Sequence, residues 1–318
     1  MTGPGTSFFA SVLLRCGDRV LMMQRGMHKK LSPGKWANPG GHIEPDELRA
    51  PMRAAARELY EETGIKVEAL RSFGLRYVLM TVSDQIRVHF TYVATADSEP
   101  ELWQTDEGTL HWMEKDKLLA LDLSETMLVT MEDYLAHPDC STVRLGLRRG
   151  LEADWIATDA RPDATFRPAA GTIARHGDRR LLLHRSEHKE IAPGLWANIG
   201  GHMEPEELND PSATALREFG EEAGIPPEGL RNFAFSGALL VAKPHEFGLL
   251  FNYSAELEEE KSIAANEEDG AFHWIDKREI DGLPMTAPMK ALALADARGD
   301  RPQVGLAYGE EIRLYGIG

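Results

Sequence analysis

The chain contains very little cysteine. Cys16 and Cys140 are the only two among its 318 residues, and neither belongs to a CxxC pair. A secreted, disulfide-rich class is therefore disfavoured, and a reduced cytoplasmic setting is expected. The sequence also lacks a basic N-terminal stretch followed by an apolar run, and it has no run of about 20 apolar residues. We expect neither a signal peptide nor a membrane span.

Positive charge is also scarce. Lys and Arg together number 35 against 51 Asp and Glu, which gives a formal net charge of −16 at pH 7. Such a surface repels nucleic acid backbones and anionic membranes unless a local basic patch intervenes. The basic stretches KLSPGK and RLGLRRG are short. We therefore expect no membrane partner and no extended nucleic acid partner.

What the chain has instead is a duplication. Segments 24–65 and 184–225 align without a gap and share 23 identical residues in 42 positions. HWMEKDKL at 111–118 matches HWIDKREI at 273–280, and LGLRRGLE at 145–152 weakly matches VGLAYGEE at 304–311. A repeat of about 160 residues suits one domain. We predict domains at 1–157 and 167–318, joined by a linker at 158–166 that is rich in Asp, Pro and Thr.

Each copy contains an acidic helix among strand-like runs. The first helix is predicted to begin near Pro51, since proline suits the first helical position, and to end at Gly64. The second is predicted to begin at Pro211, with Asp210 as its N-cap, and to end at Gly224. Strands and helices mixed in this way indicate an α/β (α+β) class, in which helices cover the faces of a small sheet.

Three carboxylates recur in these helices. Residues three and four positions apart share one helical face, and like charges at that spacing cost roughly a few tenths of a kcal/mol per pair. A bound divalent cation would remove this repulsion through its positive charge, and hard divalent cations prefer oxygen ligands such as these. The sequence therefore predicts two metal sites, one on Glu58, Glu61 and Glu62 and one on Glu218, Glu221 and Glu222.

The duplicated motif resembles that of the Nudix hydrolases. That family's pattern is Gly, five residues, Glu, seven residues, then Arg-Glu-apolar-x-Glu-Glu-x-Gly-apolar, and this chain carries it twice, from Gly41 to Ile65 and from Gly201 to Ile225. Both copies depart from it in one respect, because nine residues separate Glu47 from Arg57 and Glu207 from Arg217. The positions of Glu47 and Glu207 in the site are therefore left open.

The resemblance implies two α/β/α sandwich domains, each with a mixed sheet and helices on both faces. It also implies hydrolysis of a pyrophosphate bond in a nucleoside diphosphate-linked substrate or a modified nucleoside triphosphate, with Mg²⁺ or Mn²⁺ as the cofactor. The glutamate trios would act as metal ligands or base, helped by the carbonyls of Gly40 and Gly200. Arg57 and Arg217 lie four residues before Glu61 and Glu221, so each can hold that carboxylate in place; a plain surface salt bridge is the alternative.

The resemblance to the Nudix hydrolases also implies a further carboxylate, in the loop just before the strand that carries the HW pair of each copy. Glu107 is the first-domain candidate for metal ligand or general base, and Glu268 is favoured over Glu267 and Asp269 in the second. For any one of them, a solvated acidic loop is an equally good interpretation.

Candidate substrate contacts precede each Gly-Gly pair. Cationic side chains can hold phosphates, whereas the tryptophans can either stack on a base or belong to the core. These residues are Arg25, Lys29, Trp36 and Asn38, with Arg185, Lys189, Trp196 and Asn198 in the second copy.

The main hypothesis is a cytoplasmic hydrolase with two similar sites and a small-molecule nucleotide substrate. One alternative is a single active domain with a scaffold domain; Gly220 inside the second helix, which costs roughly 1 kcal/mol relative to Ala, is a slight hint that the second is the scaffold. Another is a nucleotide-sensing module without turnover, which the retention of all three carboxylates in both copies disfavours. The two domains can pair within one chain, or the chain can form a homodimer.

Overall fold

The computed structural model describes residues 3–138, 142–263 and 270–317 of the chain. It divides into two compact units. The N-terminal unit comprises Ser7–Phe166 with Lys243–Glu246, and the C-terminal unit comprises Met1–Thr6, Arg167–Ala242 and Phe247–Gly318. Each unit is built on one copy of the repeat.

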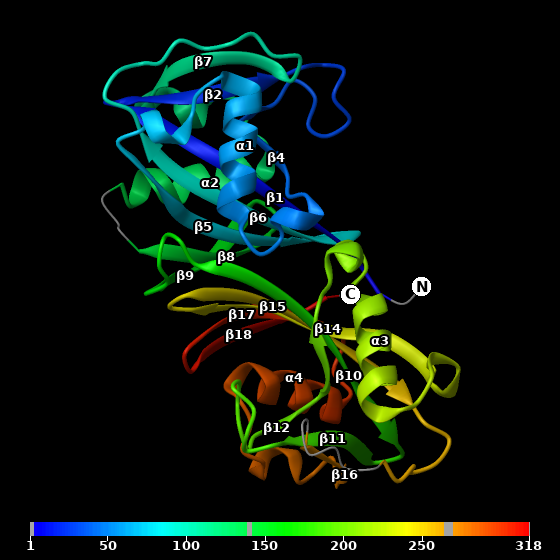
Figure 1. Cartoon of the computed structure of the whole chain (residues 1–318). Helices are drawn as coiled ribbons and strands as arrows, with labels where there is room; N and C mark the ends of the chain where they lie inside the picture. The colour runs from blue at the N-terminus through cyan, green and yellow to red at the C-terminus, as the bar shows by residue number, and fades with distance from the viewer. Residues whose placement is uncertain (1–2, 139–141, 264–269, 318) are drawn as a thin grey trace. The chain divides into compact units, whose positions relative to one another are not determined.

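The N-terminal unit is a mixed sheet with two α-helices (Figure 1). The strand order is β3-β2-β1-β6-β5-β8-β9, with β4 on β1 and β7 on β2; β5 and β8 run parallel, while β8 and β9 run antiparallel. Its elements are β1 (Gly5–Cys16), β2 (Arg19–Arg25), β3 (Trp36–Ala37), β4 (Gly40–His42), α1 (Pro51–Thr63), β5 (Ser72–Val82), β6 (Gln85–Thr95), β7 (Gly108–Glu114), α2 (Glu125–Ala136), β8 (Val143–Arg149) and β9 (Glu152–Thr158).

The C-terminal unit repeats this plan. Its order is β12-β11-β10-β15-β14-β17-β18, with β13 on β10 and β16 on β11, and β14 and β17 are parallel. Its elements are β10 (Thr165–His176), β11 (Arg179–Arg185), β12 (Trp196–Ala197), β13 (Ile199–His202), α3 (Pro211–Ala223), β14 (Arg231–Lys243), β15 (Glu246–Glu256), β16 (Gly270–Asp276), α4 (Ala287–Arg298), β17 (Gln303–Tyr308) and β18 (Glu311–Gly316).

Core packing places the two helices of the C-terminal unit on opposite faces of its sheet. Ala174 packs in one cluster with Phe219 of α3, whereas its neighbour Ile173 packs in another with Ala293 of α4. Successive side chains of a strand point to opposite faces, so α3 and α4 cover different faces. The predicted class, a mixed sheet with helices on both faces, is confirmed.

The acidic helices begin and end where the sequence predicts. Pro51 and Pro211 are their first residues, and the Asp210 carboxylate accepts hydrogen bonds from the backbone N–H groups of Ser212 and Ala213. Gly64 and Gly224 end the helices with φ of 77° and 65°. A residue with a Cβ is strained in that left-handed conformation, which explains glycine at both stops.

The segment proposed as a linker contacts the N-terminal unit. Ala160 and Ala164 are buried, the Arg161 N–H donates to the Pro244 carbonyl at 2.8 Å, and Pro162 accepts from Leu75 at 2.9 Å. Independent folding of the two halves remains a prediction. Among the described residues, no helix has the length and apolar character that a membrane crossing requires.

Two glycines, one inside α3 and one at its C-cap, should respond oppositely to substitution by alanine. Gly220 lies inside the helix, and beyond the adjoining helix backbone an added Cβ would meet no heavy atom closer than 3.8 Å, so Gly220→Ala should stabilise the C-terminal unit by about 0.5–1 kcal/mol. Gly224→Ala is the matched control and should destabilise by about 1 kcal/mol, because its φ is left-handed. Urea unfolding of both variants measures the difference. Stabilisation by both would show that the Gly224 conformation carries no strain.

Candidate functional site

Glu62 on α1 is a buried acidic residue of the N-terminal unit. Its side chain is buried, with 4% exposure for the residue, and its Oε2 accepts a hydrogen bond of 2.8 Å from the backbone N–H of Gly40. Burial raises the pKa of Glu62 to about 8, and the neighbouring carboxylates Glu58 and Glu107 act in the same direction. Glu222 accepts the same bond from Gly200 at 3.2 Å.

Glu58 lies directly over the second glycine of the Gly-Gly pair. A Cβ added to Gly41 would lie 2.4 Å from the Glu58 Oε1, and one added to Gly201 would lie 2.3 Å from the Glu218 Oε1. No real Cβ tolerates such a distance, so glycine is required for the carboxylate to lie against β4 or β13. Burial raises the pKa values of both glutamates.

Arg57 joins these carboxylates to the preceding loop. Its Nε and Nη2 donate to the two oxygens of Glu47 at 3.0 and 2.9 Å, and its Nη1 donates to Glu58 at 2.8 Å and Glu61 at 3.1 Å. A fifth bond, from Nη2 to the His42 carbonyl, is 3.0 Å long. Burial by itself would raise the pKa of Glu47, but the hydrogen bonds from Arg57 hold that pKa below its usual range.

Arg217 repeats all five bonds in the C-terminal unit. Its Nε and Nη2 donate to Glu207 at 2.8 and 3.0 Å, Nη1 donates to Glu218 and Glu221 at 2.8 and 3.2 Å, and Nη2 donates to the His202 carbonyl at 3.2 Å. Although burial raises it, hydrogen bonds from Arg217, Glu204 and Thr214 lower the pKa of Glu207 to about 2. Glu47 and Glu207, whose roles the motif left open, are thus the bidentate partners of the arginines.

The donor set suits a hard cation. The three helical carboxylates are hard oxygen donors, and the glycine cradle brings Glu58 against the strand that carries Gly40. As placed here, no three His, Cys, Asp or Glu side chains of the described residues converge on one point. Arg57 instead draws Glu58 and Glu61 toward itself. The residues fit a divalent ion chemically, and binding would require these two carboxylates to turn.

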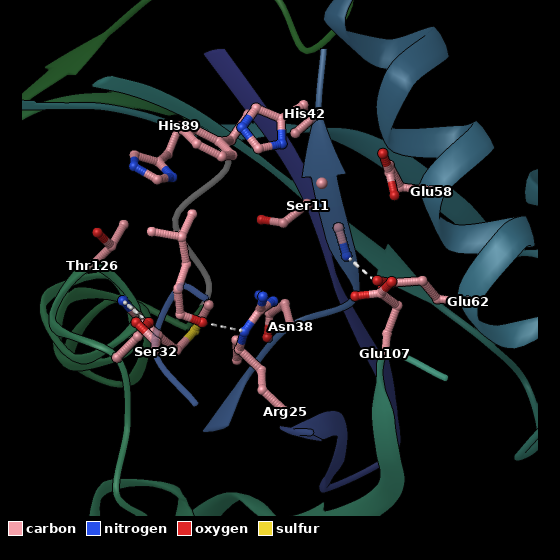
Figure 2. Close-up of a pocket in the computed structure, with 18 of the residues that line it drawn as sticks. Ser11, Arg25, Ser32, Asn38, His42, Glu58, Glu62, His89, Glu107 and Thr126 are labelled. Atoms are coloured by element: carbon pink, nitrogen blue, oxygen red, sulfur yellow. Dashed lines mark hydrogen bonds between the residues drawn. The ribbon is translucent and has the colours of Figure 1, made fainter. Parts of the chain in front are cut away.

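A cavity of about 900 Å³ opens beside α1 in the N-terminal unit. Figure 2 shows Glu58 and Glu62 on one side of it, His89 and Thr126 on the other, and Asn38 between them. The described acidic residues that line the cavity are Glu44, Glu58, Glu61, Glu62, Asp106 and Glu107, and the basic ones are Arg25, His42, Arg87, His89 and Arg148.

Two predicted site residues form an ion pair beside the helical carboxylates Glu58 and Glu62, which form the acidic wall of the cavity. The Lys29 Nζ forms an ion pair with the Glu107 Oε1 at 2.5 Å. Glu107 lines the cavity and acts electrostatically on Glu62, so the loop carboxylate lies close to the helical trio. Its second-domain counterpart, Glu268, lies outside the described residues, as do Glu267 and Asp269.

Asn38 and Asn198 occupy equivalent positions in different hydrogen-bonding states. The Asn198 Nδ2 donates to the Asn252 Oδ1 at 2.8 Å, and the Asn252 Nδ2 in turn donates to the Ser236 Oγ at 2.7 Å. Asn38 is 3% exposed and lines the cavity, yet neither its Nδ2 nor its Oδ1 has a partner among the described residues.

The remaining predicted contacts are divided between cavity and core. Arg25 lines the cavity, and its Nε donates to the Leu31 carbonyl, just as Arg185 donates to Ile191. Trp36 packs on the core cluster around Leu13 and is not among the lining residues, while Trp196 packs on the cluster around Ile173. The Lys189 N–H donates to the Ser186 carbonyl.

The cavity is also lined by Arg87, His89 and Arg148, which the sequence did not single out as site residues. They lie on β6 and β8, outside the strongly repeated segments. A comparison of the two copies could have identified these three residues, because the matching residues of the second copy, Gly248, Leu250 and Ala307, are small or apolar.

Comparison with known proteins identifies the family. The NUDIX domain model matches residues 6–134 and 165–296, so the chain belongs to this family and holds two copies of its domain. The predicted tandem duplication is confirmed.

Individual relatives match over short segments. The chain is 38% identical over 66 residues to the m7GpppN-mRNA hydrolase NUDT17 of Bos taurus, covering 20% of this chain and 21% of that protein. It is 40% identical over 76 residues to diphosphoinositol polyphosphate phosphohydrolase 2 of Rattus norvegicus, covering 24% and 36%. Among solved structures, a MutT protein from Bacillus halodurans is similar at 23% identity, covering 48% of this chain and 97% of that one, with a TM-score of 0.37. The matches thus span about a fifth to a third of the curated relatives.

Glu62 should make stability fall with pH when divalent ions are absent. Because its pKa is raised to about 8, the folded chain binds more protons than the unfolded chain between about pH 5 and 8. The free energy of unfolding should therefore decrease by up to about 1.4 kcal/mol per pH unit in that range. Urea unfolding in EDTA measures it.

Glu62→Gln should flatten this slope, since glutamine can still accept from Gly40 but does not ionise. Glu61→Gln is the matched control on the same helix, and it should leave the slope in place because Glu61 is 55% exposed. An unchanged slope in Glu62→Gln would show that another group causes it.

Proposed function

We propose that the chain is a metal-dependent pyrophosphohydrolase with two similar sites. The substrate would be a nucleoside diphosphate linked to another group, or a modified nucleoside triphosphate. The single observation that carries this proposal is the cluster around Arg57, which recurs bond for bond around Arg217. Membership of the NUDIX family supports it.

In each domain the chain's residues would divide the chemistry. Glu58, Glu61 and Glu62, with the Gly40 carbonyl, would hold the ion, and Glu218, Glu221, Glu222 and Gly200 would do so in the second domain. Bound Mg²⁺ or Mn²⁺ would neutralise the pyrophosphate and lower the pKa of an attacking water. A glutamate, from the trio or Glu107, would accept the proton of that water as the new P–O bond forms and the anhydride P–O bond breaks.

Cationic side chains beside these carboxylates would bind the phosphates of the substrate. Arg25 lines the cavity, and Lys29 would exchange its ion pair with Glu107 for a phosphate when an ion occupies the acidic side. The relatives' names describe an mRNA cap hydrolase and a diphosphoinositol polyphosphate phosphohydrolase, which are different substrate classes. They therefore favour no particular leaving group for this chain.

A substrate screen tests the proposal directly. Nucleotide sugars, dinucleotides and modified triphosphates would be incubated with Mg²⁺ or Mn²⁺, and released phosphate or pyrophosphate would be measured after any needed phosphatase step. We expect turnover of at least one class, and its loss in excess EDTA because clustered carboxylates alone repel the substrate. Full turnover in EDTA would contradict the metal requirement, and binding without turnover would favour a sensing module.

Each site should depend on its own acidic helix. Glu61→Gln and Glu221→Gln keep side-chain size while removing a charge, and each should lower turnover at its own site by on the order of a hundredfold. With one shared substrate, each single variant retains part of the activity and the double variant almost none. With two substrates, each variant loses a different one.

Glu206→Gln, outside the arginine cluster, is the control for a surface charge change. If Glu61→Gln abolishes all turnover while Glu221→Gln has no effect, the C-terminal domain is a scaffold and the two-site proposal is wrong.

A further inference from the structure

Two arginines of the N-terminal unit flank a threonine on one row of the sheet. Thr81 of β5 is in register with Arg87 of β6 on one side and with Arg148 of β8 on the other. Directly paired residues point to the same face, so both arginines lie on the Thr81 face, with backbones about 10 Å apart across two strand spacings. All three residues line the cavity.

A histidine extends this row of polar residues along β6. His89 follows Arg87 by two positions on β6 and therefore points to the same face. Its ring stacks on Phe9 with centroids 4.8 Å apart and an interplanar angle of 8°. Burial is the main cause that lowers the pKa of His89 to about 3, and the nearby Arg87 and Arg148 act in the same direction. The ring is therefore neutral near pH 7 and can still donate a hydrogen bond from an N–H.

The carboxylates that pair with these arginines lie outside the cavity. Arg87 donates to Asp84 at 3.0 Å and to the Ser83 Oγ at 2.6 Å, and Arg148 donates to Glu125 at 2.6 Å. The side chains of Asp84 and Glu125 are 75% and 63% exposed, and neither lines the cavity. Exposed ion pairs of this kind contribute little.

Arg148 retains unused donor capacity inside the cavity wall. Its Nη1 also donates to the Gly150 carbonyl at 2.5 Å, but its Nε is buried and has no partner among the described residues. A buried donor without an acceptor is costly, and a phosphate oxygen is a strong acceptor for a guanidinium.

The C-terminal unit shows that the fold does not need this basic row. At the matching positions, Leu250 and Ala307 pack with Leu239, Val241 and Leu292 in an apolar cluster, and Gly248 replaces Arg87. Leu292 matches Thr130, which lines the N-terminal cavity. The same framework therefore accommodates apolar side chains in place of the basic ones.

We propose that Arg87, Arg148 and His89 form an anion subsite of the N-terminal domain that binds a phosphate group of the substrate remote from the scissile pyrophosphate. This inference rests on the proposed function, and it makes the two sites different in specificity. The subsite faces the acidic wall across the cavity, since His89 and Thr126 lie opposite Glu58 and Glu62 (Figure 2). A substrate with phosphates at two separated places would span it, and the C-terminal site would not distinguish such a substrate.

Inorganic phosphate in EDTA probes the subsite without turnover. Calorimetric titration of the full chain should show saturable binding, and Arg87→Gln with Arg148→Gln should weaken it about tenfold or more, because charge-assisted hydrogen bonds are lost. Arg149→Gln is the matched control on β8: its side chain points to the other face and pairs with Asp154, so affinity should stay within about twofold. The single variant Arg87→Gln, at a partly exposed position, serves if the double variant does not fold.

Phosphate binding and hydrolysis separate the two claims. Saturable binding that the arginine variants lose supports the subsite even if no pyrophosphate substrate is turned over, in which case only the proposed function fails. Hydrolysis with phosphate binding unaffected by Arg87→Gln and Arg148→Gln overturns the subsite alone, as does the absence of saturable binding in the unaltered chain. For an active substrate, removal of its remote phosphate should lower kcat/KM at the N-terminal site of the unaltered chain. In the Arg87→Gln, Arg148→Gln double variant, the same removal should leave kcat/KM at that site unchanged.

Discussion

Each domain depends on one arginine that uses all five of its N–H donors. Arg57 joins the loop carboxylate Glu47, the β4 carbonyl of His42 and the helical carboxylates Glu58 and Glu61. Without a cation among them, these acids would repel one another in a partly buried place. A lysine has three donors on a flexible stem and could not make the planar, bidentate contact with Glu47. The arginine therefore offsets part of the negative charge of the site and ties α1 to the β4 backbone and to the loop that carries Glu47.

The duplicated part of this arrangement was predictable from sequence. Helix starts at Pro51 and Pro211 and stops at Gly64 and Gly224 follow from local backbone rules, which tertiary packing did not override here. The nine-residue spacing before Arg57 was harder to interpret. Glu47 ends a 3-10 turn, and the chain bends at Leu48–Ala50 before α1 begins, so the two extra residues do not move the carboxylate away from the guanidinium.

The opposite wall of the cavity could not be predicted in the same way. It requires the register of β5 with both β6 and β8, which brings Thr81 beside Arg148 across 67 positions of sequence. Register depends on long-range packing and turn geometry rather than on local pattern. Lys29 and Glu107 show the same limitation, because both were predicted as site residues while their ion pair was not.

The two copies together separate what the fold needs from what a ligand needs. Asn198 satisfies its amide with Asn252 and Ser236, so that position can be completed within the protein. Asn38 keeps the same residue type, but Thr91 replaces Asn252 at the matching position of β6 and bonds Ser11 instead. A buried amide without hydrogen-bond partners costs about 1–3 kcal/mol. Stability alone therefore gives no reason to retain asparagine at position 38. Together with the unpartnered Nε of Arg148, the Asn38 amide places hydrogen-bonding capacity along the N-terminal cavity that the described protein groups do not use and that a polar ligand can use in place of water.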